Sequence, residues 1–266
     1  QTFTGIVNFG DGSGDQALQL NPDNTFLLSH RYDDNGHYTV TVTISDNAGG
    51  VTPASFGVTV NDTAPVATVS NSGPVPVGGP GAVTLFNVFD PSFADTAAGF
   101  LYCFDFGNTG TFQVVNSSSA TALIPANFLA APGTLTVRAR VADKDGLFTD
   151  YLTTVTIVDS PPRVTLPGKQ AASTSAPYTE SGSFTDVANK PWTASVNYGD
   201  GTGVHTLALN PDNSFDLSHQ YAAAGTYTIT VRVTDNYGVT GVAAQSVVVS
   251  VPPPAAEQIT TLINTG

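Results

Sequence analysis

The chain has 266 residues, of which 41% are apolar and only 11% are charged. It can therefore form hydrophobic cores, while its surface must consist largely of uncharged polar residues and glycine. Its 21 acidic residues against 8 Lys and Arg give a net charge of −13, which excludes nucleic acid as a partner and favours cation binding or solubility in salty surroundings.

The first predicted element is a glycine-rich loop, NFGDGSGD at residues 8–15, which we interpret as a hairpin turn. A second turn signal follows at residues 21–24, NPDN, where proline suits the second turn position. Residues 37–44 then alternate polar and apolar side chains, which predicts a strand with one buried face. Tyr38 lies two residues after Gly36, and Tyr227 lies two residues after Gly225, a spacing that resembles the tyrosine corner of sandwich folds.

This pattern occurs three times along the chain. VNFGDGSG recurs as VNYGDGTG, and LQLNPDNTFLLSHRY recurs as LALNPDNSFDLSHQY. A more divergent middle copy has FDFGNTG at the loop and PGTLTVRARVADKDG at the last strand. In each copy the loop glycine precedes a late aspartate by 36 residues: Gly10 and Asp46, Gly107 and Asp143, Gly199 and Asp235. The copies start 97 and 92 residues apart, the size of an immunoglobulin-like sandwich.

Proline-containing junctions separate the copies: VNDTAPV (60–66), VDSPPRV (158–164) and VPPPA (251–255). Proline stiffens a linker and lacks the N–H that a sheet ladder needs. We therefore predict an all-β, rod-like array of tandem immunoglobulin-like β-sandwiches. The expected domains are 1–62, 63–159 and 160–251, followed at 252–266 by a proline linker and the start of a helical segment.

The pattern FGDG…L.H.Y…G.YTV.V.V.D..G resembles the PKD (polycystic kidney disease) domain, an immunoglobulin-like β-sandwich frequent in bacterial surface proteins. The first copy carries it at Phe9-Gly10-Asp11-Gly12, Leu28, His30, Tyr32, Gly36, Tyr38, Val40, Val42, Asp46 and Gly49. The third copy carries it at Tyr198-Gly199-Asp200-Gly201, Leu217, His219, Tyr221, Gly225, Tyr227, Ile229, Val231, Asp235 and Gly238. The middle copy departs from the pattern, because Asn108 replaces the loop aspartate and Leu135 replaces the tyrosine. FDPSFADTAAGF and DKDGLFTDY look like variants from planctomycete-type surface proteins.

The first copy is shorter than the others. Only nine residues precede Gly10, so the copy lacks about two strands, which correspond to residues 178–186 of the third copy. A sandwich without these strands exposes apolar surface and open strand edges. We expect the chain to be a piece of a longer protein; pairing with a strand from another chain is the alternative.

Residue patterns that could suggest an enzyme have simpler structural interpretations. Ser29 and His30 are adjacent on a predicted strand and point to opposite faces, so they cannot form a nucleophile and base. The acidic pairs at 33–34 and 143–145 have no aromatic platform beside them, which favours solvated turns over glycoside chemistry.

The remaining single residues favour structural roles as well. Trp192 is the only tryptophan, which is typical of a core or rim residue. Lys144 lies in a turn, whereas a self-made isopeptide crosslink needs a lysine in the core. Cys103 is alone between apolar neighbours, so we expect a packed strand thiol and no disulfide.

Calcium is the one metal for which the sequence offers candidates. Asp11-x-Ser13-x-Asp15 mimics the start of an EF-hand loop but lacks its glycine and its bidentate glutamate. Some PKD domains bind calcium between the N-terminal linker and loop acids, and the resemblance implies such sites here. The predicted ligands are Asn61, Asp62, Asp105 and Asp143 at one junction, and Asp159, Asn197 and Asp235 at the next.

Together these features predict a non-enzymatic, extracellular or cell-surface repeat segment that acts as a stalk, a spacer or an adhesion surface. The expected partners are other surface proteins or extracellular polysaccharide, and no segment approaches a membrane span. The alternative function is an accessory binding region of a secreted polymer-degrading enzyme. No cofactor other than calcium is expected.

Overall fold

The computed structural model describes residues 1–187 and 191–253. By their internal contacts these residues form two compact units. The first comprises Gln1–Gly73, Pro80–Phe128 and Thr134–Val155, and the second comprises Pro74–Gly79, Leu129–Gly133 and the described part of Thr156–Gly266. Below, repeat 1, repeat 2 and repeat 3 denote the predicted ranges 1–62, 63–159 and 160–251. The helical segment predicted near the C-terminus lies almost entirely outside the described residues.

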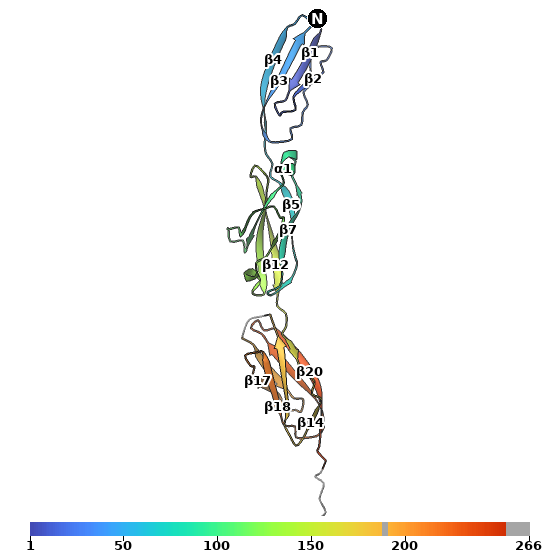
Figure 1. Ribbon diagram of the computed structural model, residues 1–266, viewed down its shortest axis with the longest axis vertical. Helices are drawn as coiled ribbons and strands as arrows, with labels where there is room; N and C mark the ends of the chain where they lie inside the picture. Colours follow the sequence, from blue (N-terminus) through green and yellow to red (C-terminus); the bar gives the residue numbers. More distant parts are fainter. Residues whose placement is uncertain (188–190, 254–266) are drawn as a thin grey trace, which may run out of the picture. The chain divides into compact units, whose positions relative to one another are not determined.

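Repeat 1 forms a single antiparallel sheet (Figure 1, blue). Its strands are β1 (Phe3–Asn8), β2 (Asp15–Leu18), β3 (Gly36–Asp46) and β4 (Val51–Val60), in the order β2-β1-β3-β4. The predicted alternation is confirmed in β3, where Val40 and Val42 are buried and Thr39 and Thr41 are not. These two valines pack with Val7 and Phe9 to form a small core.

Repeat 2 forms two sheets, in the orders β10-β7-β5 and β6-β12-β11-β8-β9. Its strands are β5 (Val66–Asn71), β6 (Val75–Pro76), β7 (Ala82–Phe89), β8 (Leu101–Phe106), β9 (Val114–Ser117), β10 (Thr121–Leu123), β11 (Gly133–Ala142) and β12 (Phe148–Val158). It also contains a short helix α1 (Phe93–Ala98) and a 3₁₀ turn η1 (Ala126–Leu129), neither of which the apolar periodicity predicts. Helix α1 is capped by Ser92, whose side chain accepts a hydrogen bond from the Asp95 amide.

Repeat 3 has the same two-sheet arrangement, in the orders β13-β15-β18 and β14-β20-β19-β16-β17. Its strands are β13 (Arg163–Thr165), β14 (Ala171–Ser173), β15 (Tyr178–Thr185), β16 (Thr193–Asn197), β17 (Val204–Leu207), β18 (Ser214–His219), β19 (Gly225–Thr234) and β20 (Thr240–Ser250). Inward-facing residues of the two sheets form one core, which includes Phe215, Leu217, Ile229 and Val231. The all-β prediction is therefore confirmed.

Two matched tyrosines bind the loops that precede β3 and β19. The Tyr38 hydroxyl donates to the Asp34 carbonyl oxygen at 3.0 Å, and the Tyr227 hydroxyl donates to the Ala223 carbonyl oxygen at 3.0 Å. The predicted tyrosine corners are therefore present in repeats 1 and 3. The predicted packing of Cys103 is also confirmed, since its thiol is free and buried.

Candidate functional site

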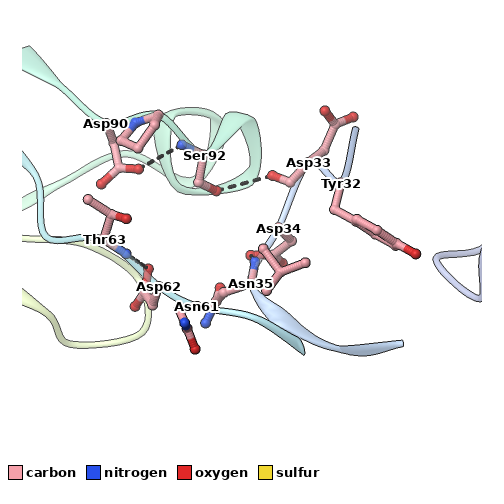
Figure 2. A pocket seen from close by; sticks show the side chains of 11 residues that line it. Tyr32, Asp33, Asp34, Asn35, Asn61, Asp62, Thr63, Asp90 and Ser92 are labelled. Atoms are coloured by element: carbon pink, nitrogen blue, oxygen red, sulfur yellow. Dashed lines mark hydrogen bonds between the residues drawn. The ribbon is translucent and has the colours of Figure 1, made fainter. Parts of the chain in front are cut away.

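A pocket in the first unit lies where the linker after β4 approaches repeat 2 (Figure 2). It is lined by residues 32–35 of repeat 1, by residues 60–63 at the linker and by residues 90–92 after β7. Figure 2 shows Asp62 and Asp90 on the linker side and the repeat 2 side of this pocket. Carboxylates therefore reach the pocket from both the linker and the sandwich.

Three carboxylates form what we call the repeat 2 cluster: Asp62 of the preceding linker, and Asp90 and Asp143 of repeat 2. One oxygen of each accepts hydrogen bonds from nearby backbone amides: Asp62 from Thr63 at 2.8 Å, Asp90 from Ser92 at 2.8 Å, and Asp143 from Asp145, Gly146 and Leu147 at 2.7–2.9 Å. Asp90 and Asp143 are only 4% and 3% exposed. Their second oxygens are buried without a hydrogen-bond partner.

The charges in this cluster oppose one another. Burial raises the pKa of Asp90, and the negative charges of Asp95 and Asp143 raise it further. Burial and the charges of Asp143, Asp95 and Asp145 likewise raise the pKa of Asp62. These carboxylates are therefore close enough to repel each other, and a cation placed among them would relieve the repulsion.

An equivalent set, the repeat 3 cluster, is formed by Asp159 of the preceding linker with Asp186 and Asp235 of repeat 3. Asp159 accepts from the Ser160 amide at 2.9 Å, and Asp235 accepts from the Tyr237 and Val239 amides at 2.8 and 2.9 Å. The second oxygens of Asp159 and Asp235 are buried without a hydrogen-bond partner. Burial raises the pKa of Asp159, as do the charges of Asp235 and Asp186. The two repeats therefore build the same arrangement from linker, post-strand and late-turn aspartates.

Repeat 1 provides a natural contrast. Its late-turn aspartate, Asp46, accepts amide hydrogen bonds from Ala48 and Gly50, and its second oxygen accepts from the side chain of Gln1. Asp46 thus has partners for both oxygens, whereas Asp143 and Asp235 each keep one buried oxygen unsatisfied.

A buried carboxylate oxygen without a partner is costly, and it calls for a proton or a cation. Calcium prefers hard oxygen ligands such as carboxylates and backbone carbonyls, in a flexible geometry. Asp62, Asp90 and Asp143 fit this preference in repeat 2, as do Asp159, Asp186 and Asp235 in repeat 3. Within the described residues neither set converges as tightly as Asp34, Asp95 and Asp145, whose oxygens lie within 4.8 Å of one another. The linker aspartates would therefore have to close onto the sandwich to share one ion.

The structure brings some of the predicted ligands close together and places others far from them. Asp62 lies near Asp143, and Asp159 lies near Asp235, as their mutual effects on pKa show. Asn61 is exposed at the pocket. Asp105, however, pairs with Arg138 in the ladder of β8 and β11, while Leu101 pairs with Ala142 next to Asp143. Asp105 lies four residues after Leu101 along β8, which places it roughly 13 Å from the end of the sheet that carries Asp143.

The oxygens of Asp105 have other partners, since they accept from Thr109, Gly110 and Arg138. Asn197 is likewise at the far end of β16, where it pairs with Thr230 and accepts from the Gly199 amide. The residues that take their places, Asp90 and Asp186, were missed by the sequence reasoning. The available signal was an aspartate directly after a strand, in VFD and SFTD.

The glycine loops have a structural role. His30 Nε2 lies 2.7 Å from Asp11 Oδ2, and the His30 ring stacks on Phe9. In repeat 3, His219 Nε2 lies 2.6 Å from Asp200 Oδ2, and its ring stacks on Tyr198. Each histidine is thereby held between an aromatic ring and the turn aspartate of its own repeat.

The loops do not form the EF-hand arrangement. Asp11 also accepts from the Ser13 hydroxyl at 2.6 Å, so it is satisfied within the turn. Gly10 has a φ of +75°, and a Cβ there would lie 2.6 Å from the Thr39 carbonyl oxygen. The first glycine of the motif is required for this close approach.

A sequence model of the PKD domain matches residues 2–60 and 159–251, which together make up more than half of the chain. No curated protein matches the sequence. Among the helices in the described residues, none has the length and apolar character needed to cross a membrane.

Several solved structures are similar over nearly the whole chain. The titin I-band fragment I67–I69 has 12% identity and a TM-score of 0.37, with 93% of this chain and 88% of that chain covered. Sidekick-1 immunoglobulin domains 1–5 have 9% identity and a TM-score of 0.34, with 94% of this chain covered. The chain spans 54% of the length of that Sidekick-1 fragment. A Bacteroides ovatus mixed-linkage glucan utilization locus protein, SGBP-B, solved with a heptasaccharide, has 18% identity and a TM-score of 0.25, with 94% of this chain and 60% of that chain covered.

Proposed function

Because this chain belongs to the PKD domain family, we propose that it is a non-enzymatic, extracellular or cell-surface segment that spaces or presents other parts of a protein. The single observation that carries this proposal is the repeated placement of a linker aspartate beside buried, unsatisfied carboxylates of the sandwich that follows it. A site of this kind can fix a linker to the sandwich that follows it.

Calcium is the cation that the clusters would hold. Each cluster supplies three carboxylates, and its late-turn aspartate presents one free oxygen. When bound, calcium would offset their repulsion and tie the linker to the sandwich. The proposed role is therefore a spacer in which calcium ties each linker to the sandwich that follows it.

Binding of a polymer by an accessory region is less well supported. A glycan platform needs an aromatic ring that is free to stack on a sugar. The Trp192 ring packs edge-to-face on Phe184 with centroids 5.2 Å apart, and its Nε1 donates to Asp186 at 2.7 Å. Trp192 is therefore engaged in the packing of repeat 3.

Thermal unfolding of the full chain in calcium and in EGTA tests this proposal. Saturating calcium should raise the melting temperature by several degrees, because a ligand at about 100 times its Kd stabilises the folded state by about 2.7 kcal/mol. Asp235→Asn should reduce this shift. Asp46→Asn should leave it unchanged, because Asp46 has partners for both oxygens. Equal melting temperatures in calcium and EGTA would refute calcium binding.

A further inference from the structure

A lysine occupies the tightest carboxylate cage among the described residues of the first unit. Lys144 Nζ lies 2.8 Å from Asp34 Oδ1 and 3.3 Å from Asp95 Oδ1, and it also contacts Asp145. Asp95 is fully buried, and neither of its oxygens has a hydrogen-bond partner. The ammonium group of Lys144 therefore holds the position that a metal ion would take in such a cage.

The protonation of Lys144 agrees with this role. Lysine is a cation at neutral pH, and the Lys144 ammonium group donates hydrogen bonds to both Asp145 and Asp34. A permanently charged ammonium group is a counter-ion for Asp95, and it is not the neutral amine that an isopeptide bond would require.

The cage joins two repeats, because Asp34 belongs to repeat 1 and the other three residues belong to repeat 2. Backbone contacts extend the junction: the Asp33 carbonyl oxygen accepts from the Ala94 amide at 3.0 Å and from the Ser92 hydroxyl at 3.1 Å (Figure 2). With its amide oriented to donate, Asn35 reaches Asp145 at 2.9 Å. The loop 33–35 of repeat 1 thus contacts both α1 and the turn after β11.

Sequence comparison of the repeats shows that this junction is specialised on both sides. The loop that reads Asp33-Asp34-Asn35 in repeat 1 reads Ala-Ala-Pro in repeat 2 (130–132) and Ala-Ala-Ala in repeat 3 (222–224). The position of Lys144 is an asparagine in the other two repeats, Asn47 and Asn236. The segment between Asp90 and β8 is longer than its counterpart between Asp186 and β16, and the added residues include Asp95 on α1.

We infer that α1 and the Asp143–Gly146 turn of repeat 2 form a docking surface for the acidic loop of the preceding repeat, with Lys144 as a built-in cation that fixes the contact without a metal ion. The partner is recognised by its charge, since an Ala-Ala-Pro or Ala-Ala-Ala loop offers no carboxylate to Lys144. This contact uses a lysine as its cation and lies beside the repeat 2 cluster, with which it shares the turn that begins at Asp143. Complementary loops would then determine which consecutive repeats pack against each other.

Distance measurement between spin labels in the full chain tests the inference. Labels are attached at Ser55→Cys in repeat 1 and Ser118→Cys in repeat 2, both exposed positions, with Cys103→Ser to remove the native thiol. The parent should show one narrow distance distribution that is the same in EGTA and in calcium. In Asp34→Asn, the fraction of molecules whose two repeats have separated should rise roughly tenfold or more, because the charged hydrogen bond between Asp34 and Lys144 is lost.

Asp34→Asn is the decisive variant because it leaves Lys144 paired with Asp95 and Asp145 and so keeps repeat 2 intact. Lys144→Asn should broaden the distribution as well, and the double variant should be no broader than Lys144→Asn alone. Asp33→Asn is the matched control, since Asp33 contacts Ser92 and Ala94 through its backbone carbonyl oxygen, and it should leave the distribution narrow. A narrow distribution for Asp34→Asn would overturn the inference. So would a parent distribution that broadens in EGTA, because the contact would then depend on a metal ion.

Discussion

At the scale of single residues, the recurring motif depends on a hydrogen-bonded aspartate in the glycine loop. Burial raises the pKa of Asp200, but hydrogen bonds from Thr202 and His219 outweigh it and lower the pKa to about 2 from 3.8. The loop aspartate is therefore a fixed charged acceptor, and its partner histidine lies 19 residues later in the chain. This pairing explains why glycine loop and histidine occur together in repeats 1 and 3.

The Asp200 pairing predicts a defined pH dependence. Because its folded-state pKa lies below its unfolded value, Asp200 contributes stability above pH 3.8 and loses it as the pH falls from 3.8 to about 2. Asp200→Asn should therefore lower the melting temperature at pH 7, and the difference from wild type should shrink towards pH 2. A difference that stays constant between pH 7 and pH 2 would contradict the account. Thermal unfolding followed by circular dichroism over this range makes the measurement.

At the scale of secondary-structure elements, repeat 3 has a second sheet, β13-β15-β18, whereas repeat 1 has the single sheet β2-β1-β3-β4. In repeat 3, β18 pairs with β15, and Phe215 is fully buried over Gly182, where a Cβ would lie 2.5 Å from the phenyl ring. The matching segment of repeat 1, residues 25–30, forms no strand, and Phe26 is 40% exposed. The same sequence pattern therefore produces a buried strand only where its neighbour is present.

A matched pair of substitutions tests this difference. Phe215→Ala should destabilise repeat 3 by about 3–5 kcal/mol, the usual cost of removing a fully buried phenyl ring. Phe26→Ala should destabilise repeat 1 by much less, because its ring is partly in water already. Hydrogen exchange read by mass spectrometry reports on each repeat separately within the full chain. Equal loss of protection in the two variants would contradict the conclusion that this segment is buried in repeat 3 and not in repeat 1.

The sequence predicts strands and turns well but predicts site residues only in part. Alternation in β3 and β19 and the 36-residue spacing place Asp143 and Asp235 correctly at the turns after long strands. Asp105 could not be excluded from the cluster by sequence, because the register that pairs it with Arg138 is a property of the sheet. Asp95 was also missed, since α1 spans only six residues and shows no apolar periodicity.

At the scale of the whole molecule, the acidic chain supplies one cation of its own, and we propose that it binds calcium as a second. In the first unit, Lys144 neutralises carboxylates from repeats 1 and 2. Among the residues that the structure describes, no lysine forms an ion pair with the linker aspartates Asp62 and Asp159, and their raised pKa values reflect burial and neighbouring negative charge. We expect a diffusible cation to complete these two clusters. Their aspartates contribute to the net charge of −13, so part of this charge serves the proposed role.

Calcium titration of the full chain by isothermal calorimetry at pH 7 tests the central claim most directly. The account predicts two calcium ions bound per chain, one at each linker cluster. Asp143→Asn should remove one of them and Asp235→Asn should remove the other, while Asp46→Asn should keep both. A chain that binds no calcium, or one whose stoichiometry is unchanged by both Asp143→Asn and Asp235→Asn, would contradict the account.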